Sequence, residues 1–96
     1  MANTEIRRLA MLDVLAQCPR YEANEAFLAI ALRDIGNAVA RDLLRVELAW
    51  LRDAGLIAVT EIADVWIAKL TLRGLDAASG ATVIPGVHRP APEASR

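Results

Sequence analysis

The strongest structural signal in the chain lies in residues 40–71, which read ARDLLRVELAWLRDAGLIAVTEIADVWIAKLT. The first part, about residues 40–54, has leucines at helical spacing and predicts a helix that ends at Gly55, where a left-handed cap is expected. The period then changes, because residues 56–62 and 65–70 are rich in β-branched side chains and predict two strands joined by a short turn. The stretch therefore predicts a helix that runs directly into a β-hairpin.

Two further helices are predicted on the N-terminal side of this stretch. The first spans roughly residues 4–17, is apolar on nearly all sides and stops before Pro19. The second begins at Asn24, a good N-cap, and ends at the turn signal Gly36-Asn37. We expect residues 20–23 to form only a connector. A tight turn containing Gly between the second and third helices is the outline of a helix-turn-helix.

A helix-turn-helix followed at once by a β-hairpin is a winged helix, so we expect a mainly α fold with a small β-hairpin. The predicted parts are three helices, a two-stranded wing, a short helix from Leu72 to about Ala78, and a tail. Residues 1–80 are expected to form the winged-helix domain. Residues 81–96 are Pro-rich and are expected to be an extended or disordered tail, of which nothing beyond Gly86 packs on the domain.

The chain also resembles a known family, on motifs that cover most of its length. These motifs are Asn24-Glu25, Val46-Glu47-Leu48-Ala49-Trp50-Leu51, Ala54-Gly55-Leu56, Val65-Trp66-Ile67-Ala68-Lys69-Leu70-Thr71, Arg73-Gly74-Leu75-Asp76 and Pro85-Gly86-Val87-His88-Arg89-Pro90. They are similar to small proteins of about 100 residues from Mu-like phages and prophages, which are often labelled ArsR-type or winged-helix regulators. The resemblance implies a winged-helix fold and a phage context. One departure is Ala40, where relatives often carry Ser or Thr, so the cap of the third helix should be weaker here.

Composition excludes several classes of protein. The 96 residues include one cysteine, Cys18, and one histidine, His88, which excludes an internal disulfide and a zinc site of the ArsR type. No uncharged apolar stretch is long enough to cross a membrane, and no signal peptide is recognisable. We find no catalytic constellation and no Gly-rich phosphate loop, so we expect no enzyme and no cofactor. The expected location is the cytoplasm of a bacterial host cell.

Contact with DNA is one interpretation of the third helix and the wing. Arg41, Arg45 and Arg52 cluster on one side of this helix, where arginines can reach phosphates or guanine edges in a major groove. Lys69 is the only base of the hairpin and the fourth candidate for DNA binding. The alternative is a solvated polar face, since three acidic residues of the same helix cancel the three positive charges. The wing turn is itself acidic, so DNA binding would be weak or assisted.

Apolar surface suggests a protein partner as well. Met11 and Val14 lie on the first helix, which is apolar on more sides than one small domain can cover, and we expect a homodimer that buries one of them. Leu43, Val46 and Trp50 form a second stripe on the third helix. Trp50 is interpreted either as a core residue wedged between the first helix and the wing, or as an anchor in a partner surface.

Two functions from different classes follow from these patterns. The first is a phage-encoded DNA-binding or regulatory protein whose third helix enters the major groove, with Arg41 and Arg45 nearest the bases. The second is a winged-helix adaptor between proteins in phage assembly or DNA packaging, with little affinity for DNA. A continuous positive face on the third helix and wing would favour DNA, whereas an apolar or acidic face would favour an adaptor.

Overall fold

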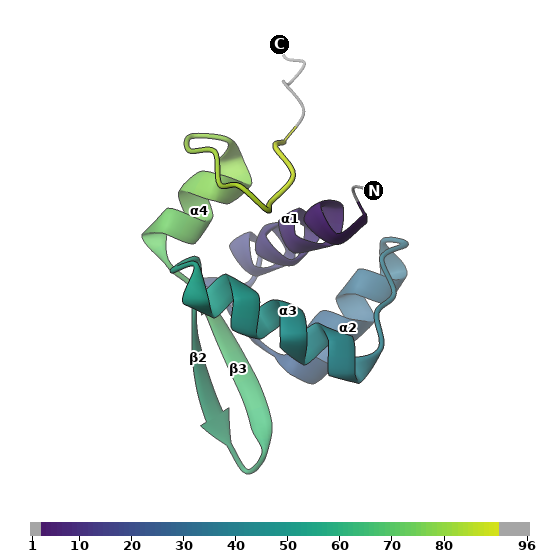
Figure 1. The fold of residues 1–96 in the computed structure, drawn as a ribbon. Coiled ribbons are helices and arrows are strands. Elements are labelled where there is room, and N and C mark those ends of the chain that lie inside the picture. Colours follow the sequence, from purple (N-terminus) through teal and green to yellow (C-terminus); the bar gives the residue numbers. More distant parts are fainter. Residues whose placement is uncertain (1–2, 91–96) are drawn as a thin grey trace.

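The fold combines four helices with a three-stranded antiparallel sheet (Figure 1). It is known from a computed structural model that describes residues 3–90. Within that range, no helix is both long and apolar enough to span a membrane. The elements in chain order are α1 (Asn3–Ala16), the 3-10 turn η1 (Pro19–Tyr21), β1 (Glu22–Asn24), α2 (Glu25–Asp34), α3 (Arg41–Asp53), β2 (Ile57–Ile62), β3 (Val65–Leu70) and α4 (Leu72–Ser79).

Local capping signals place the helix ends where the sequence predicts them. The Asn24 side chain accepts a hydrogen bond from the Phe27 amide at 2.8 Å and begins α2. Thr71 caps α4 in the same way, accepting from the Gly74 amide at 3.0 Å. Gly55 follows α3 with a φ of +80°, a left-handed conformation that glycine adopts without steric cost. Ala40 provides no side-chain cap for α3, as expected.

The sheet contains one strand that the sequence did not predict. Strand β1 pairs antiparallel with β3, which lies between β1 and β2, so Glu22 faces Lys69 and Asn24 faces Ile67. The expected connector over residues 20–23 and the expected two-stranded sheet are therefore corrected. A strand of three residues is too short to show an alternating pattern, and it exists because β3 offers it a partner.

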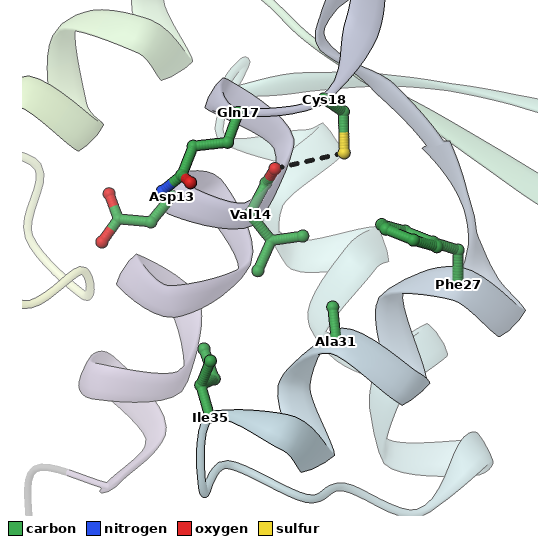
Figure 2. A pocket seen from close by; sticks show the side chains of 7 residues that line it. All are labelled: Asp13, Val14, Gln17, Cys18, Phe27, Ala31 and Ile35. Atoms are coloured by element: carbon green, nitrogen blue, oxygen red, sulfur yellow. Dashed lines mark hydrogen bonds between the residues drawn. The ribbon is translucent and has the colours of Figure 1, made fainter.

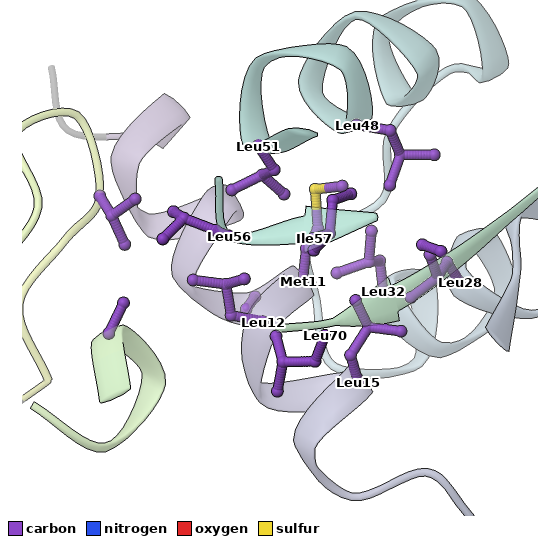
Figure 3. Close-up of a cluster of buried hydrophobic side chains, with 14 of the residues drawn as sticks. Met11, Leu12, Leu15, Leu28, Leu32, Leu48, Leu51, Leu56, Ile57 and Leu70 are labelled. Atoms are coloured by element: carbon purple, nitrogen blue, oxygen red, sulfur yellow. The ribbon is translucent and has the colours of Figure 1, made fainter. Parts of the chain in front are cut away.

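The core is aliphatic and draws on all the longer elements. Figure 3 shows Met11, Leu12 and Leu15 of α1 facing leucines of α2 and α3 and the start of the hairpin. The Met11 side chain is 0% exposed. Met11 is thus a core residue and cannot contribute to a dimer interface without unfolding, which corrects its place among the predicted interface residues.

The segment after α4 folds back onto the domain. Ile84 and Val87 belong to the hydrophobic core, with 7% and 8% exposure, and the His88 amide donates a hydrogen bond to the Glu5 carbonyl at 3.1 Å. In Figure 1 this yellow segment runs alongside the N-terminal part of α1. The expectation that nothing beyond Gly86 packs on the domain is therefore wrong, because burial of the Val87 side chain offsets the entropy of ordering this part of the segment. Residues 91–96 of the predicted tail lie outside the described residues.

Candidate interaction surface around the third helix

Helix α3 has one fully buried face. Leu44, Leu48 and Leu51 are at most 1% exposed and belong to the core, as the sequence predicts. Glu47 lies on the same face and is 2% exposed. Its carboxylate accepts a hydrogen bond from Arg8 at 2.7 Å and one from Arg7 at 3.4 Å, so the buried charge is paired.

The opposite face of α3 carries no basic residue. Asp42, Val46, Ala49 and Asp53 follow one another at spacings of four, three and four residues and form one ridge on the outside of the helix. Val46 is 61% exposed, and the side chain of Asp53 is 72% exposed. We call these four residues the outer ridge. Its two carboxylates and two apolar side chains are a poor match for phosphate, which attracts cations.

Arg45 is bound to other residues of the domain, although its side chain is 31% exposed. Its guanidinium donates two hydrogen bonds to the Glu25 carboxylate, at 2.8 and 2.6 Å, and a third to the Asp64 carbonyl at 2.6 Å. The guanidinium also lies 5.0 Å from the centre of the Trp66 ring. Three hydrogen bonds and a cation–π contact leave Arg45 little freedom to read a base edge, so it links α2, α3 and the wing turn.

Glu25 is a residue whose structural role the sequence does not indicate. It is 4% exposed, and besides Arg45 it accepts a hydrogen bond from the Trp66 amide at 2.8 Å. The hydrogen bonds from Arg45 hold the pKa of Glu25 at about 2, below its usual value of 4.5, although burial acts in the opposite direction. The only signal in the sequence was a single carboxylate in the first turn of an apolar helix, a position that the helix dipole also favours.

Two of the other three predicted DNA-binding residues lie on the same side of α3 as Arg45. The third lies on the hairpin. The Arg41 side chain is 72% exposed and its guanidinium is 4.0 Å from the Glu25 carboxylate. Arg52 is 45% exposed, pairs with Asp53 at 3.1 Å and lies 5.9 Å from the Trp66 ring centre. Lys69 is exposed on β3, opposite Glu22 of β1. Arg41 and Arg52 each have a carboxylate nearby, and they lie beside the outer ridge without covering it.

The turn between β2 and β3, which is the predicted wing turn, adds negative charge, as the sequence predicts. Glu61 and Asp64 are exposed at the end of the hairpin. Ala63 and Asp64 both have positive φ values, 52° and 67°, which is the backbone of a tight two-residue hairpin turn. Figure 1 shows this end of β2 and β3 projecting away from the helices.

Trp50 occupies the remaining side of α3 and is half-buried. The Arg8 guanidinium stacks on its ring, 3.8 Å from the centre, and also donates a hydrogen bond to the Gly86 carbonyl at 3.0 Å. Gly86 lies so close to the ring that a Cβ atom there would be 2.6 Å from Trp50 Cζ2. Trp50 therefore contacts Arg8 of α1 and Gly86 of the C-terminal segment.

The apolar stripe of α3 is only partly covered. Leu43 is 37% exposed and lies next to Val46, which belongs to the outer ridge.

Val14, the second predicted residue of the dimer interface, is half-buried on α1 and lines a hollow between α1 and α2. Among the described residues, no group of three potential metal ligands occurs.

Comparison with known proteins places the chain in a phage context. It is 40% identical over 91 residues to the uncharacterized protein gp26 of Escherichia phage Mu, a match that covers 95% of this chain and 94% of gp26. It is 36% identical over 73 residues to an uncharacterized protein of Haemophilus influenzae, covering 75% of this chain and 71% of that protein. No protein-family model and no solved structure matches the chain. The expected relation to Mu-like phages is confirmed, and the chain belongs to the family of phage Mu gp26.

Proposed function

We propose that this chain is a phage-encoded winged-helix protein that acts as an adaptor between proteins. The winged-helix assignment is supported by the order of elements, in which β1 separates the first two helices and the β2–β3 hairpin follows the third. The strand order β1-β3-β2 places β3, which ends the hairpin, in the middle of the sheet. In proteins of this fold the third helix usually contacts the DNA bases. The chemistry of α3 therefore distinguishes the two candidate functions.

The outer ridge is the observation that carries the adaptor proposal. The face of α3 that points away from the core holds Asp42 and Asp53 around Val46 and Ala49, and Arg45 is bound to Glu25. Counterion release requires free cations near phosphate, and this ridge offers anions. An apolar centre between two carboxylates instead fits a protein surface with an apolar patch and flanking Lys or Arg side chains.

DNA binding is the second candidate, because one observation favours it. Arg41 and Arg52 are 72% and 45% exposed on the same side of α3. Two arginines with nearby carboxylates would support only weak, salt-sensitive contact with the DNA backbone. This candidate makes a distinct prediction, namely that the arginines and not the ridge control binding.

Site-specific photo-cross-linking separates the two candidates. A photoreactive residue replaces Val46 in cells that express the chain together with the other proteins of its phage. We expect one discrete protein adduct, which Asp42→Lys together with Asp53→Lys abolishes. The matched control places the same group at Leu72, which is 75% exposed on α4 and should give no such adduct. Cross-links to DNA from position 46 would contradict the adaptor proposal.

A further inference from the structure

A second surface lies between α1 and α2. A hollow of about 400 Å³ opens there, lined by Val14 and Cys18 on one side and by Phe27, Ala31 and Ile35 on the other. Figure 2 shows Val14 and Phe27 directed into the space between the two helices. A neighbouring hollow of about 300 Å³ shares Cys18 and Phe27 with it and continues to Pro19 and Ala23. We call the two hollows together the α1–α2 groove.

The floor of the α1–α2 groove is apolar and accessible. Phe27 is 50% exposed and Ile35 is 55% exposed, although both are large hydrophobic residues. Together with Ala31 they are spaced four residues apart along α2 and its C-cap position, so they form one continuous stripe. A stripe of this kind beside a second helix forms a groove in which the apolar face of an amphipathic helix can pack.

The charge of the α1–α2 groove has a single sign. Asp13 and Glu22 are the charged residues among the described residues that line it, and both are acidic. Within residues 3–90, neither carboxylate takes part in a salt bridge. Burial raises the pKa of Asp13, as expected for a carboxylate that has lost water without gaining a cation.

We infer that the α1–α2 groove binds an amphipathic helix of a partner protein, with the apolar face on Phe27, Ala31 and Ile35 and with Lys or Arg side chains toward Asp13 and Glu22. The inference rests on the proposed function, to which it adds a binding surface separate from the outer ridge. A second copy of the chain is the weaker fit. A two-fold axis at the groove would bring the same acidic rim of both protomers together, and like charges in close contact cost affinity.

The test uses two fluorescent peptides of about 16 residues that form amphipathic helices. Both have the same Leu and Ala face, and they differ only in carrying Lys or Glu on the flanks. Fluorescence anisotropy should show the Lys peptide binding at least about tenfold more tightly than the Glu peptide. Phe27→Ser should weaken the Lys peptide by about tenfold or more, and Asp13→Asn should reduce the ratio between the two peptides. Binding should also slow alkylation of Cys18, the chain's one thiol, which lies in the groove.

Two controls keep the outcome clear. Phe27 is half exposed, so Phe27→Ser should retain the far-UV circular dichroism spectrum of the folded chain. Val46→Asp alters the outer ridge and should leave the affinity for the Lys peptide unchanged. Failure of the adaptor proposal at the ridge is therefore distinguishable from failure of peptide binding in the groove. The inference is wrong if neither peptide binds, if both bind equally, or if Phe27→Ser has no effect. It is also wrong if sedimentation shows a dimer that Phe27→Ser converts to a monomer, because the groove would then be an interface between copies.

Discussion

Glu25 and Arg45 show how a single buried carboxylate changes the role of a basic residue. On a helical wheel Arg45 belongs with Arg41 and Arg52, and nothing in the local pattern distinguishes the three. Glu25 is 20 residues away in sequence, yet its carboxylate receives two hydrogen bonds from Arg45. A buried carboxylate needs a charged partner, and the arginine that supplies one is no longer available to a ligand.

Loss of Arg45 should therefore destabilise the fold, which a solvent-facing arginine would not do. Arg45→Ala leaves Glu25 buried without its main partner, and we expect the free energy of unfolding to fall by about 2 to 4 kcal/mol. Arg41→Ala is the matched control and should change it by less than about 0.5 kcal/mol, since Arg41 is mostly exposed. Urea denaturation measures both. Equal and small losses would show that the contact with Glu25 is not structural.

The low pKa of Glu25 predicts a dependence of stability on pH. Because the folded-state pKa of about 2 lies below the usual 4.5, the ionised carboxylate stabilises the folded chain at pH values above about 4.5. This contribution is lost as the pH falls from about 4.5 towards 2, where Glu25 takes up a proton in the folded chain. Thermal melting across this range should show a loss of stability that is smaller in Glu25→Gln. An identical pH profile in both proteins would contradict the assignment.

At the scale of elements, the structure separates what is encoded locally from what depends on a distant partner. The ends of α2 and α4 could be predicted because Asn24 and Thr71 cap amides within three residues. Strand β1 could not, because its three residues acquire their conformation only by pairing with β3. The same holds for the segment after α4. Its sequence is typical of a linker, but in the structure Val87 is buried in the core.

The C-terminal segment should contribute measurably to stability. Removing residues 87–96 exposes the apolar surface that Val87 covers and deletes the hydrogen bond from the His88 amide to Glu5. Burial of one such side chain contributes about 1.5 to 3 kcal/mol, and for a domain of this size each 1 kcal/mol shifts Tm by about 4 to 8 °C. We expect a decrease in Tm of about 5 °C or more by differential scanning calorimetry. A chain that ends after Pro90 is the reference, so that the difference in Tm reports on residues 87–90 alone.

Gly86 gives an independent test of how this segment docks on Trp50. Its φ is +96°, and a Cβ atom would lie 2.6 Å from the Trp50 ring. Gly86→Ala should therefore cost about 1 to 3 kcal/mol and make the Trp50 ring more accessible. Quenching of tryptophan fluorescence by acrylamide measures this exposure, and Ala81→Gly in the same segment is the comparison. Unchanged stability and quenching in Gly86→Ala would mean that the segment is not held against Trp50.

At the scale of the whole molecule, the distribution of charge matters more than its sum. The net charge of −1 says little about partners. In the fold, however, carboxylates lie on the outer ridge of α3, at the wing turn and along the α1–α2 groove, while Arg7, Arg8 and Arg45 are bound to buried glutamates. The sequence could predict the acidic wing from residue order, but not which arginines are paired, because that depends on contacts between elements.

A DNA titration distinguishes whether the outer ridge of α3 and the arginines beside it recognise protein or DNA. A fluorescent duplex of about 25 base pairs is titrated with the chain at 50 mM salt and followed by anisotropy. We predict no saturable binding up to about 10 µM, with a weak gain in the variant that combines Asp42→Lys and Asp53→Lys. A Kd below about 1 µM for the unmodified chain, with an affinity that falls steeply with salt and is lost in Arg41→Ala with Arg52→Ala, would contradict the account and assign the surface to DNA.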